Sequence, residues 1–118
     1  MNFNIKKLKK SKDLALFLGM FSGDGCLTIG RNGFGYKIYP IVFVNTSKNH
    51  VKLFKNLFYK LFHVKGFLYI RKRKNKKDLW TFQKCSLEIY NIIHKEFEFP
   101  VGKKALKLRI PSFILNEN

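Results

Sequence analysis

The sequence predicts a single α+β domain in which a helix followed by two strands occurs twice and a third helix follows. Three stretches have helical spacing of apolar residues behind a serine, at about 12–23, 48–63 and 87–97. Two regions between them are typical of strands around turns: residues 26–31 and 68–83 alternate apolar and polar side chains, whereas 36–45 is apolar on both faces, so alternation does not assign its facing. A chain of 118 residues is long enough to form one hydrophobic core. We therefore expect a four-stranded antiparallel sheet with helices on one face.

The first helix is expected to be buried on more than one side, because the stretch from Leu14 to Phe21 is apolar almost all the way round. Ser11 is suited to cap it, and Asp13 places negative charge in its first turn. Gly19 and Gly23 lie on one face, where each costs roughly 1 kcal/mol in a helix interior. Their register predicts that another backbone, such as a partner helix, comes very close.

Asp24 and Gly25 end this helix. A carboxylate is disfavoured at a helix C-terminus, beside the last carbonyls. A divalent cation bound there would explain it, because Mg²⁺ prefers oxygen ligands and substrate phosphates. The alternative is an ordinary Asp-Gly turn into a strand, in which Gly25 lets the backbone turn.

Two hairpins follow from the alternation. The first pairs a strand at 26–31 with one at 36–45, where Pro40 suggests an edge position or a bulge. In the second, Leu68, Ile70, Trp80 and Phe82 form an apolar face. The opposite face carries the arginines, amide, hydroxyl and aromatic group typical of base-edge readout: Tyr69, Arg71, Arg73, Thr81 and Gln83.

The second and third helices have clear start signals. Thr46 or Ser47 caps the second, and Gly66 is expected to end it; Ser86 caps the third, which ends at Phe99-Pro100-Val101-Gly102. The apolar face of the second helix comprises Val51, Leu53, Phe54, Leu57, Phe58, Leu61 and Phe62. A basic arm at 1–10 and a short tail at 112–118 complete the predicted domain, 1–118.

Charge points to a polyanionic partner. The chain has 24 Lys and Arg against 7 Asp and Glu, a formal net charge of +17. The lysines do not gather on one amphipathic helix, and no apolar run has transmembrane length, so we expect no membrane partner. Cys26 and Cys85 are expected to be reduced core thiols, and the three histidines share no metal-ligand spacing. An intracellular protein is expected, and the excess of lysine and asparagine hints at an organellar genome.

The stretch Phe17-Leu18-Gly19-Met20-Phe21-Ser22-Gly23-Asp24-Gly25 resembles the nine-residue motif of the LAGLIDADG homing endonucleases. Ser22 stands where that family usually has an acid. The resemblance implies an αββαββα core with a saddle-shaped sheet over DNA. It also implies that Asp24 binds the catalytic metal together with the carbonyl of Gly23. Mg²⁺ would be the cofactor, Mn²⁺ would substitute, and Ca²⁺ would bind without supporting cleavage.

A single copy of the motif implies a homodimer that cuts both strands of near-palindromic double-stranded DNA across the minor groove. Leu16, Gly19, Met20 and Gly23 are the predicted dimer contact. Lys103, Lys104 and Ser47 are candidates to order the attacking water or stabilise the phosphate. The predicted DNA contacts are Thr28, Arg31, Lys37, Lys48, Tyr69, Arg71, Arg73, Lys76, Thr81 and Gln83. Two alternatives remain open: an RNA-binding intron maturase, and a DNA-binding protein of the same fold that does not cleave.

Overall fold

The computed structural model describes residue 9 and residues 11–102. The predicted order of helices and strands is confirmed. Apart from Lys9, the predicted basic arm lies outside the described residues, and so do Lys103, Lys104 and the tail. The elements are α2 (Lys12–Asp24), β1 (Gly25–Leu27), β2 (Gly30–Arg31), β3 (Lys37–Ile38), β4 (Pro40–Asn45), α3 (Lys48–Phe62), β5 (Phe67–Arg71), β6 (Leu79–Cys85), α4 (Leu87–Asn91) and a π-helical segment, η1 (Ile92–Glu96).

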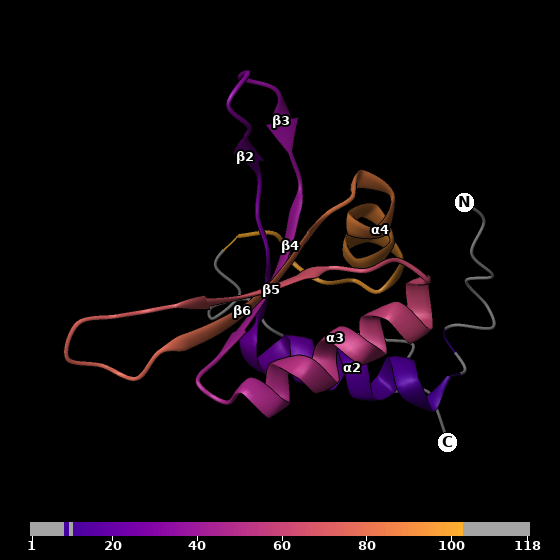
Figure 1. Ribbon diagram of the computed structural model, residues 1–118. Helices are drawn as coiled ribbons and strands as arrows, with labels where there is room; N and C mark the ends of the chain where they lie inside the picture. The colour runs from indigo at the N-terminus through magenta and orange to yellow at the C-terminus, as the bar shows by residue number, and fades with distance from the viewer. Residues whose placement is uncertain (1–8, 10, 103–118) are drawn as a thin grey trace.

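The four-stranded sheet has the order β1-β4-β6-β5, and all its neighbouring strands are antiparallel. Strands β2 and β3 form a separate two-stranded ladder that projects beyond the sheet (Figure 1). The register places Gly25, Phe43, Phe82 and Leu68 in one row across the sheet. Because side chains alternate along a strand, this row and its diagonal neighbours define the core face.

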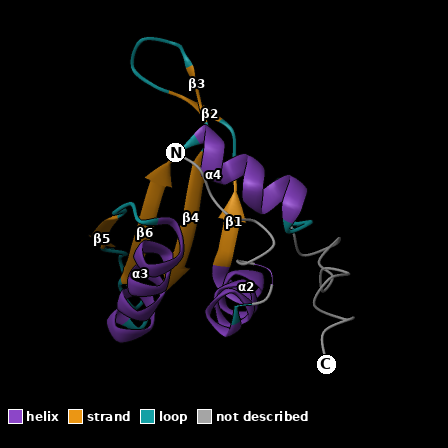
Figure 2. Cartoon of the chain, turned by 90° about the vertical axis from the view of Figure 1, so that its right-hand side faces the viewer, coloured by secondary structure: helices purple, strands orange, loops and turns teal. Residues whose placement is uncertain are grey.

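Helices α2 and α3 lie side by side against the core face (Figures 1 and 2). Phenylalanine rings join the layers: Phe54 of α3 stacks on Phe43 at 4.1 Å between ring centroids and on Phe17 of α2 at 4.9 Å. All three are fully buried. Stacked pairs add to the burial of their large apolar surfaces, so this cluster fixes the angle at which both helices meet the sheet.

Three predicted details are different in the structure. Pro40 is the first residue of β4, a central strand rather than an edge, and the ladder is interrupted just before it. Helix α3 ends at His63 in a left-handed conformation, so Gly66 does not end it; an added Cβ at Gly66 would overlap the Phe82 ring. Leu53 is 46% exposed and therefore lies outside the apolar face of α3.

Gly25 permits a close approach, although not by a ligand. Its backbone is extended, and a Cβ at this position would overlap the ring of Phe21. Glycine therefore lets the chain pass from α2 into β1 directly over a core aromatic ring. As a result Asp24 lies at the very start of the sheet.

Both hairpin turns are closed by an arginine that donates to a backbone carbonyl four residues later. Arg31 Nη1 lies 2.7 Å from the oxygen of Gly35, and Arg73 Nε and Nη2 lie 3.0 and 2.8 Å from the oxygen of Lys77. In the first turn, Asn32 Oδ1 also accepts from the backbone N–H groups of Phe34 and Tyr36. These turns are therefore ordered by their own hydrogen bonds.

Within the ranges that the structure describes, no helix is long and apolar enough to cross a membrane.

Candidate metal and nucleic-acid site

Asp24 is the last residue of α2, and its carboxylate meets the end of β4. Asn45 Nδ2 donates to Asp24 Oδ2 at 3.0 Å, and His50 Nε2 lies 3.8 Å from the same oxygen. The Asp24 side chain is 37% exposed. No described residue donates a hydrogen bond to its second oxygen, Oδ1. The carboxylate is thus held by one oxygen and free to bind a ligand through the other.

The orientation of the Asn45 amide follows from its neighbours. The backbone N–H of Ser47 lies 2.7 Å from Asn45 Oδ1, and a backbone N–H can only donate. The atom facing Ser47 must therefore be the carbonyl oxygen, which leaves Nδ2 to donate to Asp24. The loop between β4 and α3 accordingly holds the carboxylate in one orientation.

Ser47 and His50 lie next to Asp24 and Asn45. Ser47 Oγ accepts from the backbone N–H of His50 at 3.3 Å and so caps α3, as predicted. The His50 ring packs on Phe43 with 5.7 Å between centroids, and its side chain is 41% exposed. Among the described residues, no group of three or more His, Cys, Asp or Glu side chains could hold a metal ion.

An exposed stripe of α2, formed by Leu16, Gly19 and Gly23, leads to Asp24. Leu16 is 48% exposed, and a Cβ added at Gly19 or Gly23 would meet nothing within 4 Å. These residues lie on one side of the helix, uncovered by any described part of the chain. Met20, the other residue predicted for the dimer contact, is 8% exposed and packs in the chain's own core.

The sheet face opposite the helices carries most of the predicted readout residues. The register aligns Val44, Thr81 and Tyr69 in one row and Val42, Gln83 and Phe67 in the next. No helix of the described ranges packs on this face (Figure 2). Thr81 is only 4% exposed, so its hydroxyl is largely shielded, whereas Tyr69 is 45% exposed.

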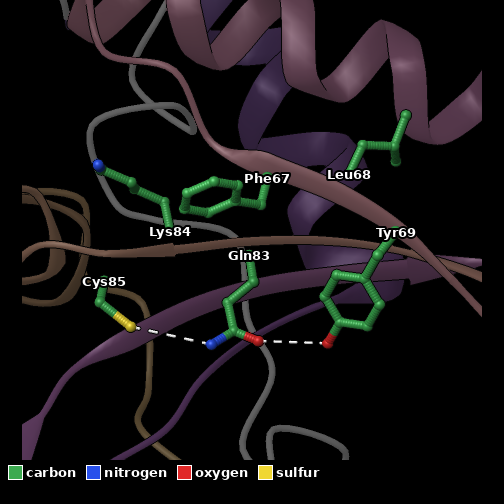
Figure 3. Close-up of a pocket in the computed structure, with 6 residues that line it drawn as sticks. All are labelled: Phe67, Leu68, Tyr69, Gln83, Lys84 and Cys85. Atoms are coloured by element: carbon green, nitrogen blue, oxygen red, sulfur yellow. Dashed lines mark hydrogen bonds between the residues drawn. The ribbon is translucent and has the colours of Figure 1, made fainter.

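A surface pocket of about 580 Å³ opens at the β5–β6 end of this face. Figure 3 shows Tyr69, Gln83 and Cys85 in a row, joined by two hydrogen bonds, while Leu68 points away from them. Neither cysteine forms a disulfide, and neither lies in the core as predicted, because Cys26 is half-buried and Cys85 is exposed. This exposure places a thiol beside the amide predicted to contact bases.

Thr28 and the predicted cationic contacts to DNA are distributed over three places. Thr28, Arg31 and Lys37 belong to the first hairpin, and Arg71, Arg73 and Lys76 to the second hairpin and its turn. Lys48 begins α3, and its Nζ lies 4.8 Å from the centroid of the Trp80 ring. No Asp or Glu occurs between Asp24 and Asp78, so most basic residues of the hairpins and of α3 have no acidic neighbour in sequence, although Lys60 of α3 pairs with Asp13.

Sequence reasoning missed Asn45 and His50 as neighbours of Asp24. The available signal was position: Asn45 is a polar residue that closes an otherwise apolar strand and directly precedes a helix cap. A contact 21 residues along the chain could not be placed without the register of β1 on β4.

Comparison with known proteins identifies the fold. No protein-family model and no curated protein matches the chain. A crystal structure of I-DmoI in complex with DNA and Mn is similar over 80% of this chain, with a TM-score of 0.51 and 23% identity. The chain spans 51% of the length of that one. A second structure, an I-DmoI variant with its target DNA in the presence of Mn, aligns over 91% of this chain and 67% of that one, with 24% identity and a TM-score of 0.48.

I-DmoI is a LAGLIDADG homing endonuclease, and the fold described above is like one half-domain of that class.

Proposed function

We propose that this chain is a homodimeric, Mg²⁺-dependent endonuclease of the LAGLIDADG type that cuts both strands of a specific near-palindromic DNA duplex. The observation that carries the proposal is the place of Asp24. Its carboxylate stands at the end of the uncovered α2 stripe, with one oxygen held by Asn45 and the other open.

The dimer supplies what one chain lacks. A second copy packed on the stripe of Leu16, Gly19 and Gly23 would form an isologous contact and bring its own Asp24 to the two-fold axis. Two carboxylates, together with the scissile phosphates, would then provide oxygen ligands for the ions of a two-metal site shared between the two copies. The absence of a three-group cluster within the described part of one chain agrees with a site shared between two.

Duplex DNA is the partner that the open sheet face fits best. Two-stranded ribbons enter the major groove, and both hairpins carry arginine and lysine in excess over acidic residues. The two exposed turns would contact the backbone and bases beyond the sheet, which gives a long recognition site.

The residues present fit a bound Mg²⁺. Asp24 Oδ1 and the carbonyl of Gly23 would hold the ion, which supplies Lewis acidity to the phosphate when bound. Asn45 keeps the carboxylate turned outward, and Ser47 holds Asn45. Lys103 or Lys104 would stabilise the phosphate; both lie outside the described residues.

The reaction is hydrolysis. The oxygen of a water molecule forms a bond to phosphorus, the bond from phosphorus to one sugar oxygen breaks, and that oxygen takes up a proton while water loses one. No covalent bond to the protein forms.

The test compares two aspartates of the same helix. The dimer is incubated with a randomised duplex library in Mg²⁺ and then in Ca²⁺, using wild type, Asp24→Asn and Asp13→Asn. Asp13 pairs with Lys60 at 2.9 Å at the other end of α2. Wild type and Asp13→Asn should give discrete double-strand cuts in Mg²⁺, and Asp24→Asn should give none while still retaining duplex. Wild type that retains specific duplex without cutting it would establish a binding protein instead.

RNA binding is a second candidate, favoured by the outer surface of α3. A pocket of about 450 Å³ is lined by Lys55, Asn56, Tyr59 and Lys65, on the side of α3 that faces away from the sheet. An exposed aromatic ring among cations suits stacking on an unpaired base. Tight binding of structured RNA, lost in Tyr59→Ala and unaffected by competing duplex DNA, would support the maturase function.

A further inference from the structure

Gln83 is held at both ends of its amide. The hydroxyl of Tyr69 donates to Gln83 Oε1 at 3.3 Å, and Gln83 Nε2 lies 3.8 Å from Cys85 Sγ (Figure 3). The side chains come from two paired strands, in which Tyr69 lies opposite Thr81 and therefore next to Gln83 along the face. A side chain held in this way keeps one orientation in the mouth of the pocket.

What remains of the amide is one acceptor and one donor. An amide oxygen has two lone pairs and an amide nitrogen two N–H groups, so one of each is left after the contacts to Tyr69 and Cys85. If the amide oxygen and nitrogen of Gln83 exchanged places, one acceptor and one donor would still be left, because the Tyr69 hydroxyl and the Cys85 thiol can each donate or accept. The pocket therefore presents an adjacent donor and acceptor to its ligand.

This pattern matches one base edge of duplex DNA. In the major groove, adenine alone offers a donor, N6–H, beside an acceptor, N7, whereas guanine offers two acceptors there. The residues that line the pocket include Lys84 and no acid, so the phosphate backbone is not repelled. We propose that the Tyr69–Gln83–Cys85 row reads an adenine in each half of the DNA site, a specificity that rests on the proposed endonuclease function.

The alternative ligand would be a free base or nucleotide in the pocket. Its lining argues for an edge presented from outside, because Tyr69 and Cys85 are exposed and the pocket is a surface depression between two strands. The polar atoms point along the open face of the sheet rather than into the core (Figure 3).

The first experiment is a change of base preference. Duplexes are selected from a randomised library in Ca²⁺ by wild type, Gln83→Glu and Tyr69→Phe. A glutamate accepts only, and so prefers the N4 amino group of cytosine. Wild type should enrich adenine at one position of each half-site, Gln83→Glu should enrich cytosine at that position alone, and Tyr69→Phe should weaken the adenine preference without changing the base.

The second experiment changes the DNA instead, so it does not depend on the folding of a variant. Replacing the selected adenine by 7-deazaadenine removes N7 and should weaken wild-type binding about 10-fold. The same replacement at another adenine of the site is the control and should have no such effect. Equal effects at both positions, or a Gln83→Glu selection identical to that of wild type, would overturn the adenine assignment while leaving the endonuclease proposal standing. A wild type that enriches no duplex at all overturns both.

Discussion

At the scale of single residues, the proposed metal-dependent chemistry depends on which oxygen of Asp24 is engaged. Asn45 and His50 both approach Oδ2, and the Asn45 amide is itself oriented by the Ser47 N–H. Hydrogen bonds to a metal-binding carboxylate fix its direction and raise its affinity for the ion. The residues around Asp24 are therefore as important for the proposed site as Asp24 itself.

Asn45→Ala removes the donor to Asp24 Oδ2. Because loss of such a supporting contact typically costs 10–100-fold in metal affinity or activity, we expect a weakening of roughly 10-fold or more in Mn²⁺ binding by titration calorimetry, together with slower cleavage. Asn49→Ala, an exposed asparagine two residues after Ser47, is the matched control and should bind Mn²⁺ as wild type does. Equal affinities for the two variants would show that Asn45 has no positioning role.

Tyr90 gives a prediction about stability. Its hydroxyl is buried and has no hydrogen-bond partner among the described residues. An unpaired buried hydroxyl costs roughly 1–3 kcal/mol, so Tyr90→Phe should raise the free energy of unfolding by about 1 kcal/mol. Urea denaturation near neutral pH measures this change. Tyr36→Phe, at an exposed site on the first hairpin, should leave stability unaltered.

The same residue predicts a pH dependence. Burial, with smaller effects from Cys26 and Tyr39, raises the pKa of Tyr90 above its ordinary value of 10.0. The folded state thus favours the neutral phenol, and its contribution to stability is intact below pH 10 and is lost as the pH rises through the folded-state pKa. The free energy of unfolding of wild type should therefore fall more steeply above pH 10 than that of Tyr90→Phe. If the free energies of unfolding of the two proteins fell equally with pH, the dependence would not come from Tyr90.

At the scale of secondary-structure elements, α2 combines two requirements on one helix. One side packs in the core through Leu14, Phe17, Leu18 and Phe21, and the other exposes the stripe of Leu16, Gly19 and Gly23. Glycine weakens an isolated helix, so the stripe costs stability in the monomer. That cost is consistent with a close helix–helix contact in the proposed dimer.

Gly19→Ala should therefore change stability and association in opposite directions. The new methyl meets nothing within 4 Å in the monomer and should stabilise it by about 1 kcal/mol. In a tightly packed dimer it would separate the helices and raise the dissociation constant. Denaturation of the dilute monomer and sedimentation equilibrium measure the two effects, with Gly33→Ala as control, because a Cβ added at Gly33 in the first hairpin turn also meets nothing within 4 Å. An unchanged dissociation constant would place the dimer contact elsewhere.

Helices and strands were predicted correctly where the evidence lies in neighbouring residues of the sequence. Ser11, Ser47 and Ser86 each accept backbone hydrogen bonds as helix caps, and the alternation in the second hairpin correctly separated Tyr69 and Gln83 from the core face. Predictions failed where a residue meets a distant partner. Gly66 is required by the Phe82 ring rather than by the end of α3, and the contact of Asn45 with Asp24 depends on strand pairing.

At the scale of the whole molecule, charge and shape act together. The formal net charge is +17, and the segment between Asp24 and Asp78 has no acidic residue. In the described part of the chain, helices cover one face of the sheet and none packs on the other, so that face and the two hairpins can approach a polyanion. Affinity for DNA should consequently contain a large contribution from counterion release.

Salt dependence tests this expectation. The logarithm of the binding constant for specific duplex should fall steeply with the logarithm of salt concentration, by about 0.9 for each phosphate contact. Arg71→Gln, on the open face of β5, should reduce the slope by about 1, whereas Lys60→Gln, whose ammonium pairs with Asp13 on the helical side, should not. Equal slopes for all three proteins would place the phosphates away from the sheet.

The arginines that close the two hairpin turns have a consequence for the proposed DNA specificity. Each donates to a backbone carbonyl, of Gly35 or Lys77, so these hydrogen bonds do not depend on the side chains at the tips of the turns. Gly35 and Asn75 have positive φ, which restricts the residue type at both positions. Gly33 and Phe34 in one turn, and Lys74 and Lys76 in the other, can be exchanged without loss of these hydrogen bonds. Exchange of these four residues is thus a route to altering the proposed DNA specificity while the sheet stays unchanged.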